Sequence, residues 1–461
     1  MLGPSRNMRN STWFHEGENM NSSNLTRRSF LGALGATSLT LAACGGNATS
    51  TEGGAAASGA VTGTYAMHVQ GYDWGAGVDK ITITLDTALD SVTPEMFVVS
   101  EHKQATDWTA EDFPVIEADF PRTVTAATAN GNDIELELAC DPNNGSPFLY
   151  TMATGFNTWC DPYQLNITLA EGVEVTAGGA AVTELTISPD ATARTTSADE
   201  AGWSQGGGEY AGTQFNYAYW DPAEESKNLV IWLHGAGEGG TENTDPQVTI
   251  LANKVVALSS DEFQQTIGGA HVVAPQCPTM WMDQGGNTYI AEDATEVASI
   301  YTEALESFID SYAASVGAEK IVLAGCSNGG FMTLWMGLDR PDKYVGIVPI
   351  CEAIPDGAIS DAQIEGIKDL PMYFIWSDDD TTVDPTTHEI PTTDRLKKAG
   401  ASNLHISTTE HVVDTSGLYT NEDGTPYTYA GHWSWIYFDN NESECNDDGL
   451  KAWEFIAECL A

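Results

Sequence analysis

The segment Gly325-Cys326-Ser327-Asn328-Gly329 constrains the fold more than any other part of the chain. It follows the apolar run 320–324, typical of a short buried strand, and leads into the apolar run 331–336, which continues as a helix. A sharp strand-to-helix turn brings backbones together and strains the residue at its tip, so small residues must flank it. The pattern predicts that Ser327 is a nucleophile presented at the end of a strand. A glycine-rich loop that only caps a strand is the alternative.

A serine hydroxyl becomes reactive when a base takes its proton and a carboxylate holds that base in one tautomer. The apolar strand 372–376 leads into an acidic loop at its carboxyl end, where open α/β sheets place their sites; this loop carries Asp378, Asp379, Asp380 and Asp384. His432 lies further on, in an aromatic loop before the last predicted helix. We predict His432 as the base, whereas His405 and His411 are expected to have packing or surface roles.

These motifs resemble the secreted esterase and prolyl-oligopeptidase-like branch of the α/β-hydrolase superfamily, which also contains polyhydroxybutyrate-depolymerase-like and feruloyl-esterase-like enzymes. The resemblance covers roughly residues 205–461 and includes Gly-His-Trp-Ser-Trp at 431–435. In such enzymes the acid commonly lies in the pattern His-Gly-x-x-Asp-x-x-Val-Pro, which assigns Asp380 to the catalytic position. The chain departs from this pattern at Trp376, Ser377 and Asp384, so the alternatives stay open for Asp378, Asp379 and Asp384. The resemblance implies a catalytic triad of Ser327, His432 and Asp380.

The oxyanion formed during acyl transfer requires backbone N–H donors that are already in place. The amide of Asn328, directly after the nucleophile, is the first predicted donor. The buried strand 229–233 runs into His-Gly-Ala-Gly at 234–237, which resembles the oxyanion loop of the family. That match implies the Ala236 amide as the second donor, with Gly235 or Gly237 as alternatives. His234 ends a buried strand and is expected to shape this loop.

Two tryptophans in aromatic loops, Trp281 and Trp433, are predicted as substrate-binding residues, with a place in the core as the equal alternative. The chain contains no His-Glu-x-x-His, no Cys-x-x-Cys and no Gly-x-x-x-x-Gly-Lys-Ser/Thr motif. Acyl transfer by a serine triad needs neither a metal nor a cofactor, and we predict none.

The first residues resemble an export signal. Thr-Arg-Arg-Ser-Phe-Leu at 26–31, with the apolar stretch that follows, matches a twin-arginine signal, and Leu-Ala-Ala-Cys at 41–44 resembles a lipoprotein cleavage box. We therefore predict a signal peptide over 1–43, lipid attachment at Cys44, a flexible tether over 44–63 and anchoring at a bacterial cell surface. An ordinary secretion signal with a free cysteine is the alternative, and Met8 or Met20 could be the true start.

An export signal places the cysteines in a compartment where disulfides persist. The chain has eight cysteines, so seven remain once Cys44 is set aside. Proximity along the chain predicts the pairs Cys140–Cys160 and Cys445–Cys459. A further bridge among Cys277, Cys326 and Cys351 would leave one thiol free.

The formal charge of the chain is −48 at pH 7. Such a charge repels polyanions, so nucleic acid is excluded as a partner. Neutral or cationic substrates fit this charge better than acidic ones. The net charge of the chain does not indicate its oligomeric state.

The chain without its signal is long enough for two domains. Residues 64–190 contain short segments that alternate apolar and polar residues between turn residues, which is typical of an antiparallel sandwich; they are 64–70, 80–85, 96–99, 123–126, 133–138 and 165–169. This stretch resembles the immunoglobulin-like domain attached to certain secreted esterases. It is expected to be accessory, as a packing partner, a lid, or a binder of polymer or partner. The Gly/Ser/Thr-rich residues 191–212 are predicted to be a connector.

Residues 213–461 are predicted to form the catalytic domain. Apolar strands are expected near 214–220, 228–233, 270–274, 320–324, 345–350, 371–376 and 403–408. Helices are expected near 292–316, 328–339, 391–400 and 447–459. This alternation, with near-continuous apolar strands, predicts a mainly parallel sheet covered by helices on both faces, the α/β-hydrolase fold.

We predict an exported serine hydrolase that cleaves carboxylic esters, either small molecules or polymers. Esters are preferred to peptides because the ester-cleaving relatives carry a similar front domain and no propeller-type gate for peptides precedes the catalytic part. A prolyl-oligopeptidase-like serine peptidase is one alternative. The other is a surface binding protein in which the hydrolase fold is degenerate and catalyses nothing.

Overall fold

The computed structural model describes residues 59–240, 245–286 and 289–461. The predicted signal peptide, Cys44 and most of the predicted tether lie outside the described residues. None of the described helices is long and apolar enough to cross a membrane.

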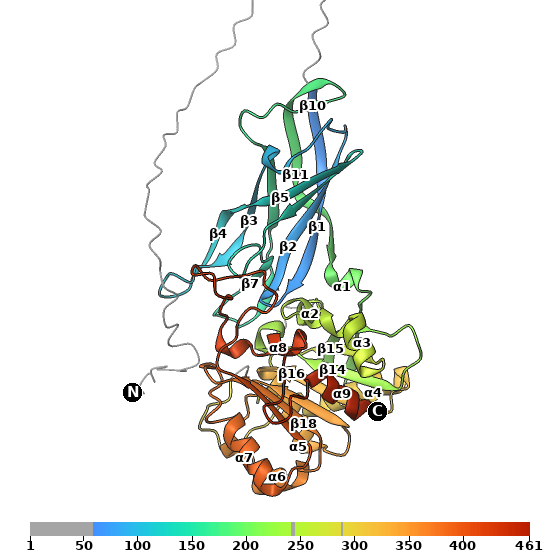
Figure 1. Cartoon of the computed structure of the whole chain (residues 1–461), viewed down its shortest axis with the longest axis vertical. Coiled ribbons are helices and arrows are strands. Elements are labelled where there is room, and N and C mark those ends of the chain that lie inside the picture. Colours follow the sequence, from blue (N-terminus) through green and yellow to red (C-terminus); the bar gives the residue numbers. More distant parts are fainter. Residues whose placement is uncertain (1–58, 241–244, 287–288) are drawn as a thin grey trace, which may run out of the picture. The chain divides into compact units, whose positions relative to one another are not determined.

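The first part of the described chain forms two β-sheets that share an apolar core (Figure 1). The strand order is β10-β11-β1-β2-β6-β5 in the larger sheet and β4-β3-β9 in the smaller one. Side-chain alternation along the strands turns Tyr65 and Ile81 of the larger sheet and Val99 and Ile167 of the smaller sheet into this core. The bounds are β1 (Gly59–Tyr72), β2 (Gly75–Leu85), β3 (Phe97–Thr106), β4 (Val115–Arg122), β5 (Val124–Asn130), β6 (Asp133–Leu138), β9 (Tyr163–Leu169), β10 (Thr176–Ala177) and β11 (Ala180–Thr196).

All six segments predicted as strands coincide with strands of these two sheets. The structure adds a two-stranded hairpin, β7 (Phe148–Tyr150) and β8 (Asn157–Trp159). The chain segments around the sandwich differ from expectation. Residues 59–63, predicted as tether, begin β1, and much of the predicted connector 191–212 is strand, because β11 pairs in parallel with β1 up to Thr196.

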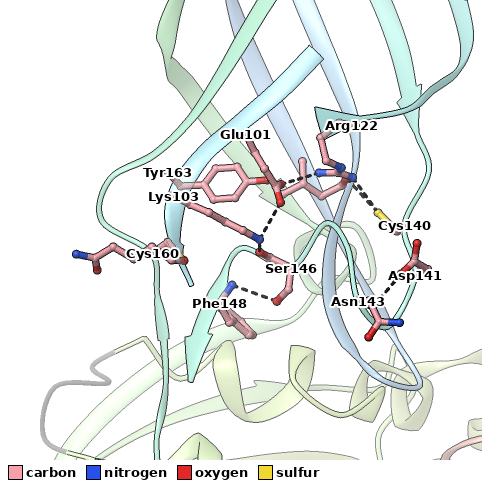
Figure 2. Close-up of polar contacts among 12 residues, drawn as sticks. Glu101, Lys103, Arg122, Cys140, Asp141, Asn143, Ser146, Phe148, Cys160 and Tyr163 are labelled. Carbon is pink, nitrogen blue, oxygen red and sulfur yellow. Dashed lines mark hydrogen bonds and ion pairs between the residues drawn. The ribbon is translucent and has the colours of Figure 1, made fainter. Parts of the chain in front are cut away.

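A buried ion cluster ties the strands of the smaller sheet together (Figure 2). The Glu101 carboxylate on β3 accepts hydrogen bonds from Lys103 Nζ at 2.8 Å, Arg122 Nη1 at 2.9 Å and Tyr163 O–H at 2.6 Å. Glu101 is 1% exposed, and a charge so deeply buried is tolerated only with partners of this kind. Arg122 also donates to the Val78 carbonyl of β2 at 2.7 Å, so the cluster joins the two sheets.

All seven cysteines within the described residues are free thiols, so the disulfides predicted from chain proximity are wrong. In the pair Cys140–Cys160, the first thiol donates to the Val78 carbonyl at 3.2 Å and the second to the Gln104 carbonyl at 3.3 Å. The ion cluster lies between the two cysteines (Figure 2).

The pair Cys445–Cys459 is also absent. Cys459 packs against Gly346 of the central sheet, whereas Cys445 lies beside Asp448 and His405. The suggested bridge among Cys277, Cys326 and Cys351 is not formed either. Short separation along the chain does not bring two thiols together when strands and turns direct them to different neighbours.

The remaining chain is built on an eight-stranded sheet with the order β12-β13-β15-β14-β16-β17-β18-β19. The six strands from β15 to β19 in this order run parallel, and β12 and β13 add an antiparallel edge. Their bounds are β12 (Ser204–Tyr210), β13 (Thr213–Trp220), β14 (Asn228–Leu233), β15 (His271–Gln276), β16 (Lys320–Cys326), β17 (Gly346–Ile350), β18 (Met372–Ser377) and β19 (Leu404–Thr409). All seven predicted strands match β13 to β19.

Helices cover both faces of this sheet (Figure 1). α5 (Asn328–Asp339) packs on the face that carries Ile347, since a Cβ on Gly337 would lie 2.9 Å from the Ile347 side chain. α9 (Ala452–Leu460) packs on the other face, where its residue Phe455 joins one apolar cluster with Val348. The other helices are α1 (Ser197–Glu200), α2 (Val248–Leu251), α3 (Asp261–Ile267), α4 (Thr302–Val316), α6 (Asp361–Ile367), α7 (Glu389–Ala399) and α8 (Trp435–Asp439).

The helix predicted over 292–316 is shorter than expected and begins at Thr302. The Ser299 hydroxyl accepts the Tyr301 amide at 3.1 Å, and the Ser299 carbonyl accepts the Thr302 hydroxyl at 3.0 Å. This local turn satisfies donors at the start of the helix and sets its first residue.

Candidate active site

The turn that carries Ser327 joins β16 to α5 and has a strained backbone. Ser327 adopts φ 56° and ψ −117°, a region that residues with side chains rarely occupy. Backbones crowd around it: a Cβ on Gly325 would lie 2.6 Å from the Leu233 carbonyl oxygen, and one on Gly329 would overlap the same oxygen. The close approach of β14 therefore requires both glycines of the motif.

Three predicted residues from loops far apart in the chain form one hydrogen-bonded series. His432 lies in the single turn Gly431–Trp433, and its Nε2 is 2.9 Å from Ser327 Oγ. Its Nδ1 is 2.7 Å from Asp380 Oδ2. Because an ionised carboxylate only accepts hydrogen bonds, Nδ1 carries the ring proton and Nε2 can accept the proton of the serine hydroxyl.

Asp380 is held in place by the loop that follows β18. Its Oδ1 accepts the backbone N–H groups of Thr382 at 2.8 Å and Val383 at 2.9 Å, and its side chain is 1% exposed. These bonds leave Oδ2 for the imidazole of His432 and fix the direction from which it approaches.

The other candidate acids and bases make hydrogen bonds to other partners or are exposed. Asp379 accepts from Ser377 and pairs with the half-exposed His411 at 2.8 Å. Asp384 accepts the Thr386 amide at 2.8 Å, and Asp378 is exposed. His405 on β19 has Nε2 2.9 Å from Asn403 Oδ1. The structure thus brings Asp380 and His432, rather than these alternatives, to the serine.

The charge balance at His432 favours its protonated form. Burial disfavours the imidazolium, but the charge of Asp380 and its hydrogen bond outweigh that effect and hold the pKa of His432 well above its usual value. Burial also raises the pKa of Cys351 to about 12, so the thiol is protonated at neutral pH. Asp380 is therefore the group that supplies the stabilising negative charge under those conditions.

Cys351 belongs to this site although the motifs did not identify it. It directly follows β17, is fully buried and has φ 36°, a second strained backbone position at this edge of the sheet. Its sulfur lies within 4.8 Å of the ligand atoms of Asp380 and His432. Its place after the strand next to β16 is the signal that could have identified it, because the carboxyl ends of neighbouring parallel strands share one edge.

The loop after β14 lies beside the serine turn. A Cβ on Gly235 would lie 3.8 Å from the Cys326 sulfur. Ala236 is the first residue of the short helix Ala236–Glu238, and Asn328 is the first residue of α5. First residues of helices have amides without an intrahelical acceptor, so both predicted oxyanion donors occupy positions suited to an anion.

His234 fixes the shape of this loop. Its Nδ1 donates to the Gly235 carbonyl at 2.6 Å, and its Nε2 accepts the Cys277 amide at 2.9 Å. Burial lowers the pKa of His234 to about 4, so the ring is neutral and can both donate and accept. These contacts agree with the structural role expected for this residue.

The hairpin β7–β8 packs on the same loop. Asn157 Nδ2 donates to Glu238 Oε1 at 3.1 Å, and Gln276 Nε2 donates to the Glu238 carbonyl at 3.0 Å. The Phe156 ring fills the space beside Gly240, where a Cβ would overlap it. Burial raises the pKa of Glu238 to about 7. No motif indicates this contact, which joins residues 81 positions apart.

The two predicted substrate-binding tryptophans differ in exposure. Trp281 is fully buried against His234 and Phe215, with ring centroids 5.3 Å and 5.9 Å away, so its ring has no surface to offer a ligand and belongs to the core. Its amide donates to the Asn328 side chain beside the serine turn. Trp433 is only partly buried and packs on Tyr429, which leaves surface next to His432.

Two groups of metal-ligating side chains occur among the described residues. One consists of Cys351, Asp380 and His432 and coincides with the hydrogen-bonded series at Ser327. The other consists of His405, Cys445 and Asp448 and involves the edge strand β19.

Residues 218–418 match the sequence profile of a family described as phospholipase/carboxylesterase. The matched segment contains Ser327 and Asp380 and ends before His432. No curated protein matches the sequence.

A solved thermostable esterase is similar in structure, with a TM-score of 0.61 and 18% sequence identity, covering 83% of this chain and 96% of the esterase. A ferulic acid esterase has a TM-score of 0.38 and 10% identity, covering 56% of this chain and 97% of that enzyme. The family profile and the first likeness show that the fold is that of an α/β-hydrolase, and this prediction is confirmed.

Proposed function

We propose that the protein is a serine hydrolase that cleaves carboxylic esters through an acyl-enzyme. The observation that carries this proposal is the series Ser327 Oγ, His432, Asp380, with separations of 2.9 Å and 2.7 Å. Such an arrangement activates a hydroxyl that is otherwise a weak nucleophile.

In the proposed reaction the Ser327 oxygen attacks the ester carbonyl carbon while His432 Nε2 takes the hydroxyl proton. Asp380 stabilises the imidazolium that forms. The amides of Asn328 and Ala236 stabilise the oxyanion, and each such donor contributes roughly 10²–10³-fold to the rate. His432 then returns the proton to the leaving alcohol, and water activated by the same base releases the acid and restores Ser327.

Esters are preferred as substrates on two grounds. The family profile that matches residues 218–418 is named for phospholipases and carboxylesterases, and the similar structure that covers 83% of the chain is an esterase. Trp433 offers partly exposed aromatic surface beside His432 for an acyl or aryl group. The proposal covers small-molecule and polymeric esters, and the peptidase alternative is an outcome of the same test.

The test combines covalent labelling with turnover. A fluorophosphonate probe is expected to label the wild type and the control Ser204→Ala, whose serine is exposed on β12, but not Ser327→Ala. A panel of p-nitrophenyl esters, feruloyl esters, polyesters and proline-containing peptides then ranks the substrate classes. A folded wild type that is neither labelled nor active on any member of the panel would favour a surface binding protein, and preferential cleavage of the peptides would favour a peptidase.

We also propose that residues 1–43 direct export by the twin-arginine route and that Cys44 carries lipid, and the support is the sequence Thr-Arg-Arg-Ser-Phe-Leu and the Leu-Ala-Ala-Cys box. We propose further that the strands β1 to β11 form an immunoglobulin-like domain, and the support is that two sheets of these strands share an apolar core. Palmitate labelling of the wild type but not of Cys44→Ser in a bacterial host tests the anchor. Equal labelling of both forms would reject it.

A further inference from the structure

Three side chains with metal-binding atoms meet where the edge strand of the sheet contacts the turn before α9. His405 comes from β19, and Cys445 and Asp448 come from the turn. One ligand atom of each lies within 4.8 Å of the other two. His405 Nδ1 is 3.6 Å from Asp448 Oδ2, which is longer than a hydrogen bond.

The hydrogen bonding of His405 leaves its Nδ1 facing Asp448. Its Nε2 is 2.9 Å from Asn403 Oδ1, an acceptor, so Nε2 carries a proton and donates it to Asn403, and Nδ1 is the nitrogen available to a metal ion. Metal-binding histidines typically donate their other N–H in this way. The ring is fixed between Tyr373 and Phe455, with centroids 5.9 Å and 5.6 Å away.

The turn holds its two ligands in a defined geometry. The Gly449 amide donates to the Cys445 carbonyl at 2.8 Å, and the Leu450 amide donates to Asp448 Oδ1 at 3.0 Å. The Cys445 thiol hydrogen-bonds to the Asp448 carboxylate. Asp448 Oδ1 is thus occupied, and Oδ2 faces the histidine.

We propose that His405, Cys445 and Asp448 bind a zinc ion, with water as the fourth ligand. Zinc bonds to nitrogen and oxygen of about 2.0–2.2 Å in a tetrahedron place those two ligand atoms about 3.3–3.5 Å apart, and the separation of 3.6 Å between Nδ1 and Oδ2 is close to that range. Thiolate and imidazole select zinc over magnesium or calcium, which take oxygen ligands. The thiolate and the carboxylate together neutralise the divalent charge.

The position of the site indicates a structural role. The Asn446 amide already donates to the Ile406 carbonyl of β19 at 2.8 Å, so the turn lies along the open edge of the sheet. A metal bridge from His405 to the turn would fasten that edge and the entry to α9. Asp448 has a side chain 53% exposed, which gives the ion a path from solvent.

Cobalt(II) is the probe for this site, because a bound thiolate gives it a charge-transfer band in the near ultraviolet. Chelator-treated full-length protein is expected to bind one cobalt with this band, to release it to zinc and to melt at higher temperature with zinc. Cys445→Ser is expected to lose the band, and Asp448→Asn, at a half-exposed position, to bind at least tenfold more weakly. The control Cys459→Ser is expected to retain the band.

The group Cys351, Asp380 and His432 is a competing site for the same ion. Cys351→Ser is therefore expected to keep the cobalt band if His405, Cys445 and Asp448 form the site. Loss of the band in Cys351→Ser, or its retention in Cys445→Ser with no weakening in Asp448→Asn, would overturn the proposal. These readouts do not depend on ester hydrolysis, so they stand apart from the proposed function.

Discussion

Replacing Glu238 by Gln isolates the contribution of one buried carboxyl to the pH dependence of stability. Glu238 lies in the loop beside Ser327, and burial raises the pKa of its carboxyl to about 7 from an ordinary value near 4.5. The folded protein therefore keeps this proton over a pH range in which the unfolded chain releases it. The stabilising contribution is fully present below about pH 4.5 and is lost as the pH rises through about 7.

The size of the effect follows from the two pKa values. About two and a half pH units separate them, and each unit is worth about 1.4 kcal/mol, so the wild type loses about 3.5 kcal/mol of unfolding free energy through this group. Gln has the shape of the neutral acid, can still accept from Asn157 and does not ionise. The variant should therefore gain about 3 kcal/mol relative to the wild type between pH 4.5 and pH 8.

Urea unfolding followed by tryptophan fluorescence at several pH values measures this difference, and the other titrating groups cancel between the two proteins. Glu184→Gln, at an exposed position on β11, is the matched control and should show a difference below about 0.5 kcal/mol at every pH. A Glu238→Gln difference that stays constant from pH 4.5 to 8 would show that Glu238 is ionised in the folded protein and would refute the reasoning.

Three further perturbations test the site. Asp380→Asn should lower kcat/KM by roughly 10³-fold or more, because Asn does not hold the His432 tautomer. In the wild type kcat/KM should rise with pH through the raised pKa of His432, since the base must be neutral, and this limb should move to lower pH in the variant; an unmoved limb contradicts the assignment. Stability should change with pH in the direction opposite to kcat/KM. The stabilising contribution of protonated His432 is complete below about pH 6.5 and is lost as the pH rises through the raised pKa of His432, which the urea unfolding midpoints measure. Gly329→Ala should lower the free energy of unfolding by roughly 3 kcal/mol, because its Cβ overlaps a strand, whereas Gly366→Ala, with nothing within 4 Å, should not; equal melting temperatures would contradict this. Asn157→Ala removes a donor from a buried carboxyl, should cost about 1–3 kcal/mol in urea unfolding and should reduce kcat; an unchanged kcat would separate the hairpin from the site.

The residues around Ser327 could be predicted because each carries a local signal. The serine is marked by glycines that a crowded turn requires, Asp380 follows the apolar run of β18, and His432 lies in the aromatic segment Gly-His-Trp-Ser-Trp. A parallel sheet then brings the carboxyl ends of β16 and β18 to one edge, whatever their separation in sequence. For this reason the predicted strands match β13 to β19, and the loops that carry Ser327 and Asp380 lie close together.

β12 shows where composition misleads. Its Gly-Gly-Gly at 206–208 is typical of a loop, yet these residues pair with Phe215, Asn216 and Tyr217 of β13. A Cβ on Gly206 would overlap the Tyr217 ring, so the glycine leaves room for an aromatic side chain on the neighbouring strand. The need for glycine comes from the neighbouring strand β13, so the Gly-rich segment by itself does not indicate that it forms a strand.

The hairpin contact could not be predicted either, because it joins segments that lie far apart in the chain. Asn157 and Phe156 contact the loop that contains Ala236. Burial raises the pKa of the Glu238 carboxyl in this loop, and the hydrogen bond from Asn157 opposes that rise. The hairpin therefore helps to position the loop that carries one of the amides proposed to hold the oxyanion.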